Sequence, residues 1–281
     1  MRPIAIIVAI LASLAASAVH AEGCDPKATA AKYPSLAGKT IRVAQDGESP
    51  PYSFREAGDF EKLVGLDADL VRATFACLGL PVEFKTGKWS GMLPSVIAGQ
   101  ADVMWNNLYY TPPRAQQVDF VTYLLAATGG MVRKGNPKNI HGLADTCGTR
   151  AAGGLGTVEV AKLEETSKAC VAAGKPAIEV ITYQDKPSGA RLLQNDRADL
   201  MMTDSGVVGQ LVTLSPNDFE RSFTIKTDFK IGPGISKPMP ELRQAIADTV
   251  PMLVADGTLA SLMTKYAFDA SLLLPVETHT K

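Results

Sequence analysis

The sequence contains little histidine, and this scarcity limits the chemistry that the chain can perform. Only three of its 281 residues are histidines, and His20 falls in an apolar stretch at the start of the chain. His141 stands in the loop-like segment NIHGL and His279 is two residues from the end, so we expect both to be solvated surface residues. A Ser-His-Asp nucleophilic site therefore has no good candidate for its base.

Nucleotide-binding motifs and an excess of positive charge are missing as well. The glycine-rich turn GGLGT lacks the Gly-Lys-Ser/Thr ending of a phosphate loop and matches the dinucleotide fingerprint poorly. Beyond residue 21 the chain carries 27 basic and 29 acidic side chains, because Arg2 is the only charged residue before that point. Such a balance lacks the basic footprint of a nucleic-acid-binding protein. We expect no cofactor and no nucleic-acid partner.

Long apolar runs are absent except at the start of the chain. Arg2 is followed by an apolar run over residues 4–18 and by the small residues Val19 and Ala21, which is the pattern of a secretory signal peptide. The run is shorter than the roughly 20 residues of a membrane-spanning helix. A lipoprotein signal that ends at Cys24 is the alternative, although the residues before this cysteine fit it poorly. We predict a signal peptide over residues 1–21, cleavage after Ala21 and export to the periplasm.

Cysteine is also scarce, with four residues at Cys24, Cys77, Cys147 and Cys170. No two of them have the close spacing of a zinc site, so we expect no metal. An exported protein meets an oxidising compartment, which favours two disulfides, and four cysteines allow three pairings. We favour Cys24–Cys77 and Cys147–Cys170, because each pair then stays within one region of the chain.

The residues that are present alternate between strand and helix patterns. In the first half, strands are predicted at 39–46, 81–87 and 101–105, a turn-rich loop at 47–54, and helices at 65–80 and 89–100. A similar series begins near Gly129, with buried strands in AIEVITY and in ADLMMTD, which ends at Asp204, and the chain closes with a strand and two helices. The pattern indicates an α/β fold in which mostly parallel sheets are flanked by helices.

Polar residues concentrate in the loops that follow these strands. Ligands in open sheets of this kind bind beyond the carboxyl ends of the strands, where DGESPPY, NNLYYTPPR, GGLGT and TDSG stand. Arg114 offers a planar fork of donors that suits a carboxylate, and Asp204 suits an ammonium group. The alternatives are an exposed arginine after a turn and an aspartate that caps a helix.

Five segments in order match the motifs of one family. They are GLDADL, WSGMLPSVIAGQADV, YTPPRAQQVDF, GLGTVE and PELRQAIADTVPMLVADGTLASLMTKY. From about residue 39 to 268 the sequence resembles the bacterial extracellular solute-binding proteins of family 3, the polar-amino-acid-binding type that serves ABC importers. The resemblance implies a type II periplasmic-binding-protein fold with two lobes joined by two crossover strands. Lobe I would comprise residues 22–127 and 232–281, and lobe II residues 128–231.

The resemblance also implies a set of ligand contacts between the lobes. Arg114 would bind a carboxylate with the backbone N–H groups of Thr157 and Val158, and Asp204 would bind an α-amino group. The remaining implied contacts are Asn106, Asn107 and Tyr109 at the head group, Trp89 on the side chain and Asp46 at the pocket floor. The chain departs from the family pattern at Ser49, at the bulky Asn-Asn and Tyr-Tyr pairs and at Val158, which leaves the ligand class open.

The function that follows is capture of an amino acid or related small carboxylate by a monomeric periplasmic protein, which passes it to an ABC permease without chemical reaction. Two alternatives use the same scaffold. One is an exported dehydratase that resembles the cyclohexadienyl dehydratases, with Glu48 or Asp46 as its acid. The other is an accessory protein that binds a solute and reports to a membrane receptor.

Overall fold

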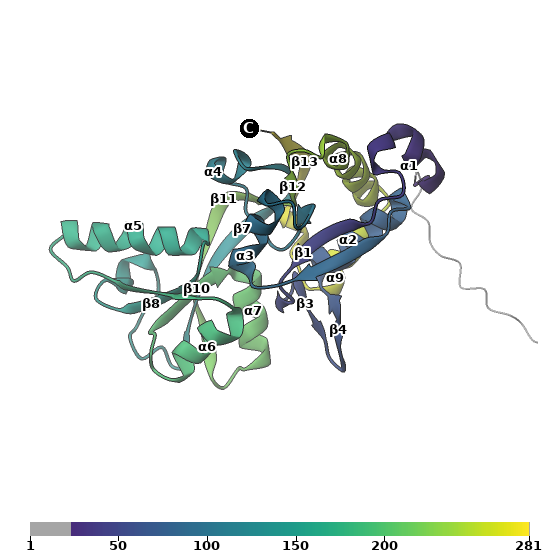
Figure 1. Ribbon diagram of the computed structural model, residues 1–281. Helices are drawn as coiled ribbons and strands as arrows, with labels where there is room; N and C mark the ends of the chain where they lie inside the picture. The colour runs from purple at the N-terminus through teal and green to yellow at the C-terminus, as the bar shows by residue number, and fades with distance from the viewer. Residues whose placement is uncertain (1–23, 281) are drawn as a thin grey trace, which may run out of the picture.

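The computed structural model describes residues 24–280, which form two α/β halves arranged end to end (Figure 1). The first half contains parallel strands in the order β5, β1, β6, and the second half contains them in the order β10, β8, β9. Their bounds are β1 (Ile41–Gln45), β5 (Val82–Thr86), β6 (Val103–Met104), β8 (Arg150–Gly154), β9 (Glu179–Tyr183) and β10 (Leu200–Asp204). The predicted fold class is confirmed.

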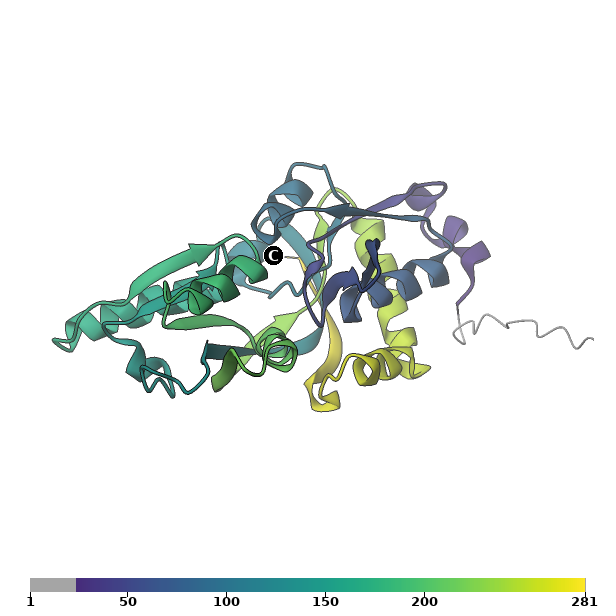
Figure 2. The same ribbon diagram turned by 90° about the horizontal axis from the view of Figure 1, so that it is seen from below.

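Two long antiparallel strands connect the halves, as the view from below also shows (Figure 2). They are β7 (Val118–Arg133) and β11 (Phe219–Ile231). One end of β7 pairs with β12 (Gly234–Ser236) in the first half, and the other end pairs with β10 in the second. The predicted lobe boundary at 127/128 falls inside β7, and the one at 231/232 falls at the end of β11. These two strands therefore occupy the positions expected of the two crossover strands. The division into lobes stays a prediction.

Helices flank both halves of this sheet. Those of the first half are α2 (Leu66–Leu78), α3 (Trp89–Ile97), α8 (Pro240–Ala255) and α9 (Thr258–Lys265), with the short α1 (Pro26–Lys32) and α4 (Pro112–Ala115). Those of the second half are α5 (Val158–Ala172), α6 (Lys186–Gln194) and α7 (Ser205–Leu214). Within residues 24–280 no single helix meets the length and apolarity of a membrane span, and only the bent pair α8 and α9 does so together.

The core of the first half shows why α2 forms where the spacing predicted it. Of the residues at the predicted helical spacing, Leu66, Leu70 and Cys77 are buried, Ala73 is partly buried and Ala76 is exposed. The two leucines pack in the same apolar cluster as residues of α8. The helix ends at Gly79, whose left-handed φ of 64° suits glycine as a C-cap.

Several structured segments were not predicted from the sequence pattern, among them α1, α7, β11 and two regions of strand. The expected loop after β1 contains β2 (Glu48–Ser49) and β3 (Ser53–Glu56), which form a separate three-stranded sheet with β4 (Asp59–Val64). Near the C-terminus, β13 (Leu273–His279) adds to β7. The imidazole of His279 stacks on the Tyr110 ring at 4.2 Å and is only partly exposed, so the expectation of a solvated surface residue was wrong for it.

Both favoured disulfides are present, and the pairing prediction is confirmed. Cys24–Cys77 ties the start of the described chain to α2, and Cys147–Cys170 ties the segment before β8 to α5. A lipid on Cys24 would need the sulfur that this disulfide uses, so the structure disfavours the lipoprotein alternative. The predicted signal peptide, residues 1–21, lies outside the described residues.

Candidate ligand-binding site

A cavity lies between the two halves at the carboxyl ends of their strands. Its lining comes from both halves: Trp89, Asn107, Tyr109 and Arg114 from the first, and Thr157, Val158, Glu159, Lys186, Thr203 and Asp204 from the second. The free space inside it is about 20 Å³, which is room for about one water molecule. Ligand pockets typically measure roughly 300–1,000 Å³, so the two halves have to separate to admit a solute.

Arg114 reaches this cavity from a helix of one turn. Thr111 caps α4, and two prolines at its start fix a helical φ, so the arginine is held at a defined place. Its Nη1 donates to the Tyr109 carbonyl at 2.7 Å, and its Nη2 donates across the cavity to the Gly156 carbonyl at 3.0 Å. The guanidinium lies 5.4 Å from the centre of the Trp89 ring. A guanidinium has five N–H donors, so donors remain for a ligand.

Asp204 faces the same cavity from the end of β10, and it also caps α7. Its Oδ1 accepts from the N–H groups of Gly206 and Val207 at 2.7 and 3.3 Å. Its Oδ2 accepts from the hydroxyls of Tyr109 at 2.7 Å and Tyr52 at 3.2 Å, both in the first half. Burial raises the pKa of Asp204 to about 6, although these hydrogen bonds oppose the shift. The capping role and the cavity position are therefore both present.

Two side-chain oxygens at the cavity have no hydrogen-bond partner among the described residues. They are Asn107 Oδ1 and Thr157 Oγ1, and both are fully enclosed by protein. Asn107 also adopts a left-handed φ of 48°, which asparagine tolerates better than most residues. Buried polar groups without partners are uncommon, so this concentration at one cavity is expected of a site that a ligand completes.

The backbone at the start of α5 matches the prediction in part. The Thr157 N–H donates to the Gly154 carbonyl at 3.1 Å, so it is not free for a ligand as predicted. Val158 is the first residue of α5, where an N–H has no acceptor within the helix. The positive end of the helix thus lies at the cavity, with an N–H group that has no acceptor within the helix.

Every predicted contact except Asn106 and Asp46 lines the cavity. Asn106 is fully buried, and its Oδ1 accepts the Asp46 N–H at 3.0 Å. The Asp46 carboxylate accepts from the Ser49 hydroxyl at 2.5 Å and from the Glu48 N–H at 3.0 Å. The Asn106 side chain thus holds the backbone of the loop after β1, and the Asp46 side chain is bonded within that same loop.

The lining also includes Glu159, Lys186 and Thr203, which were not predicted. Each stands beside a predicted feature: Thr203 precedes Asp204, Glu159 follows Val158, and Lys186 begins the helix after β9. The topology could have identified Lys186, because β9 ends at the same edge of the sheet as β8 and β10. No group of His, Cys, Asp and Glu residues within 24–280 could hold a metal ion.

The halves touch each other around the cavity. Lys88 Nζ lies 2.7 Å from an Asp185 carboxylate oxygen in the second half and 3.3 Å from Glu48 in its own half. The Ser90 hydroxyl donates to the Gln184 side chain at 3.2 Å. With the bonds of Arg114 and Asp204 described above, these contacts hold the halves closed over the cavity.

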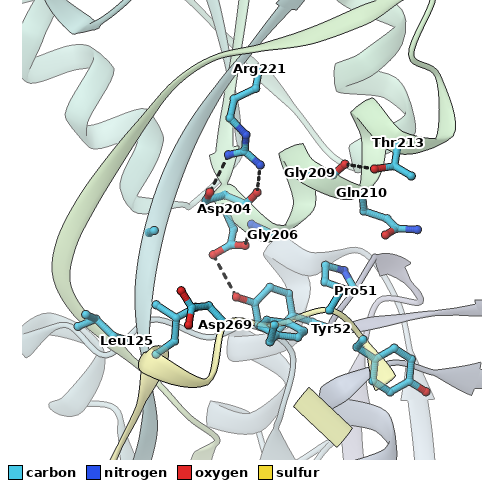
Figure 3. A pocket seen from close by; sticks show the side chains of 16 residues that line it. Pro51, Tyr52, Leu125, Asp204, Gly206, Gly209, Gln210, Thr213, Arg221 and Asp269 are labelled. Carbon is cyan, nitrogen blue, oxygen red and sulfur yellow. Dashed lines mark hydrogen bonds between the residues drawn. The ribbon is translucent and has the colours of Figure 1, made fainter. Parts of the chain in front are cut away.

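A second cavity lies behind Asp204, beside the connecting strands (Figure 3). Its polar side chains are largely paired with one another. Arg221 donates to the Ser205 carbonyl at 2.9 Å and to the Ser205 and Thr224 hydroxyls, and Tyr52 donates to Asp204. This pairing leaves the second cavity fewer free polar groups than the one that Arg114 lines.

Comparison with known proteins gives consistent results for the whole domain. The sequence profile of the family described as bacterial extracellular solute-binding proteins, family 3, matches residues 41–270. The L-cystine-binding protein TcyJ of Escherichia coli (strain K12) is 28% identical over 228 residues, which are 81% of this chain and 82% of TcyJ.

Two solved structures extend the likeness to three dimensions. An ancestral arginine-binding protein bound to arginine superposes with a TM-score of 0.74 at 28% identity, covering 82% of this chain and 99% of its own. The ancestral amino acid-binding protein AncCDT-1, described as a precursor of cyclohexadienyl dehydratase, gives 0.68 at 28% identity, covering 81% and 95%.

Proposed function

The chain belongs to the bacterial extracellular solute-binding proteins, family 3, and we propose that it binds an amino acid for an ABC importer. The observation that carries this proposal is the closed cavity in which Arg114 and Asp204, one from each half, present opposite charges to the same space. An amino acid has a carboxylate and an ammonium on one carbon, so a single head group can satisfy both residues.

Arg114 takes the ligand's carboxylate. It is already held in place by the Tyr109 and Gly156 carbonyls, and planar Arg–carboxylate pairing is strong and directional. The N–H of Val158 at the start of α5 adds a second donor of positive character to the same carboxylate. Thr157 Oγ1 and Asn107 Oδ1, which lack partners, gain them from the head group.

Asp204 takes the ligand's ammonium. The Tyr109 hydroxyl donates to Oδ2 at 2.7 Å, and the ammonium replaces it or shares this oxygen with it. Burial disfavours the charged form of the Asp204 carboxylate. A cation at this position offsets that cost, so it binds more strongly here than at a solvated aspartate.

Closure follows from the fact that the contacts come from both halves. A ligand shifts a conformational equilibrium only by its differential affinity for the two states, and only the closed state brings Arg114 and Asp204 together around it. The closed protein then presents its ligand to the permease of the importer. The predicted signal peptide at residues 1–21 supports work in the periplasm.

No chemical step is part of this proposal. The two acids considered for a dehydratase do not line the cavity: Asp46 is bonded to Ser49, and Glu48 pairs with Lys88. The relatives reported above are named as binding proteins, including the precursor of a dehydratase.

The test is a thermal-shift screen of the exported protein against L-amino acids, L-cystine, simple carboxylates and simple amines. Ligand at a hundred times its Kd stabilises a protein by about 2.7 kcal/mol, so a true ligand raises the melting temperature clearly. We expect stabilisation only by compounds that carry both groups on one carbon. Equal stabilisation by a simple amine or a simple carboxylate would contradict the proposal.

A further inference from the structure

Lys186 is a largely buried lysine whose ammonium has no hydrogen-bond or ion-pair partner among the described residues. Only 7% of the residue is exposed, and it lines the cavity between the halves. Within residues 24–280 its ammonium makes no ion pair or hydrogen bond, and its one recorded contact is the Tyr183 ring, 6.0 Å away. A largely buried side chain whose ammonium has no ion pair gains from a nearby anion, so this arrangement favours one.

The position of Lys186 in its helix makes the need for an anion greater. It is the first residue of α6, where the helix dipole disfavours positive charge. The neighbouring Asp185 does not compensate, because its side chain accepts the Ser188 N–H at 2.8 Å and pairs with Lys88 at 2.7 Å. The protein therefore places a lysine where its own fold gives no electrostatic benefit.

The other charged groups that line the cavity are Arg114, Asp204 and Glu159. Arg114 and Asp204 serve the head group in the proposed function. Glu159 is buried in the first turn of α5, where the helix dipole favours a negative charge, and it accepts a hydrogen bond from Thr128 at 3.4 Å. No ion pair joins Glu159 to Lys186, so their charged atoms lie more than 4.0 Å apart. Lys186 is therefore the one cation in the cavity lining that the head group does not use, and Glu159 is the one further anion.

We propose that Lys186 selects ligands by pairing with a carboxylate in the side chain of the bound amino acid. This inference rests on the proposed function, in which the α-amino-acid head already occupies Arg114 and Asp204. Two sources supply such a group. One is an acidic amino acid, and the other is a double amino acid such as L-cystine, whose second ammonium would meet Glu159.

Calorimetric titration with L-glutamate, L-aspartate and L-cystine, beside L-glutamine and L-asparagine as uncharged isosteres, tests this selection. We expect one of the first three to bind at least tenfold more tightly than the uncharged isosteres. Lys186→Met should weaken that ligand at least about thirtyfold, or about 2 kcal/mol, and leave the isosteres unchanged. Lys186→Arg should recover part of the loss, because it restores the positive charge.

Matched variants separate the possible outcomes. Lys168→Met, an exposed lysine of α5, controls for loss of charge, and melting curves confirm that each variant folds. Glu159→Gln distinguishes the two sources: it weakens L-cystine but not L-glutamate or L-aspartate. If uncharged or basic amino acids bind best and Lys186→Met leaves their affinity unchanged, the selection is wrong. If Arg114→Ala also binds them normally, the proposed function fails too.

Discussion

Replacement of Arg114 by alanine is expected to weaken the bound amino acid at least about a hundredfold, which is about 2.7 kcal/mol. A hydrogen bond to a charged group contributes about 1.5–3 kcal/mol, and the ligand's carboxylate would lose its charged donor in a site closed to water. The variant also loses the 3.0 Å bond to the Gly156 carbonyl, which helps to close the halves. Arg114→Lys should bind poorly as well, because an ammonium cannot supply a planar fork.

The assay is calorimetric titration of each variant with the ligand that the screen identifies, together with a melting curve without ligand. Arg197→Ala is the control, because this exposed arginine precedes β10 at the end opposite to Asp204. We expect control and wild type to agree, and the melting temperature of Arg114→Ala to change little. Wild-type affinity in Arg114→Ala would refute the carboxylate clamp, and a large loss of melting temperature would show a structural role instead.

The remaining predictions concern pH, closure and the disulfides. Asp204 binds an ammonium only when it is ionised, and its pKa is about 6. The affinity for the amino acid should therefore fall as the pH drops below about 6, approaching tenfold per pH unit. Titrations from pH 4.5 to 8 that show no such fall would exclude this role. Burial raises the pKa of Asp67 to about 7, above its unfolded value, so its stabilising contribution is lost as the pH rises through about 4 to 7. Asp67→Asn should therefore flatten the dependence of the melting temperature on pH over this range, measured without ligand. An unchanged slope of melting temperature against pH would refute this. Lys88→Met removes exposed ion pairs that contribute roughly 0–1 kcal/mol. The affinity for the ligand should therefore fall at most about fivefold at low salt and not at all at high salt. A loss of affinity that persists in high salt would point to another cause. Removal of the Cys147–Cys170 disulfide with two alanines should lower the free energy of unfolding by about 3 kcal/mol, and a urea midpoint equal to wild type would count against a constraining role.

The elements that the sequence predicted are those whose burial repeats with a clear period. The spacing of Leu66, Leu70 and Cys77 predicted one buried face of α2, and the apolar run before Asp204 became the fully buried β10. The strands that were missed lack such a pattern. β4 is exposed over most of its length and β13 alternates poorly, and both are strands because they pair with partners that local sequence does not reveal.

The site was predictable to the level of strand ends but not to that of side-chain direction. Asn106 and Asn107 are adjacent, yet Asn107 faces the cavity while Asn106 is turned toward the Asp46 backbone. Lys186 was missed for a different reason. A charged residue at the start of a helix is usually solvated, and only the approach of the first half over α6 buries it.

A crystal structure of the protein with its bound amino acid tests the central claim most directly. The account predicts the ligand between the halves, with its α-carboxylate within hydrogen-bond distance of the Arg114 guanidinium and the Val158 N–H, and its α-ammonium against Asp204 Oδ2. A ligand bound in the cavity behind Asp204, or one whose head group contacts neither Arg114 nor Asp204, would contradict it.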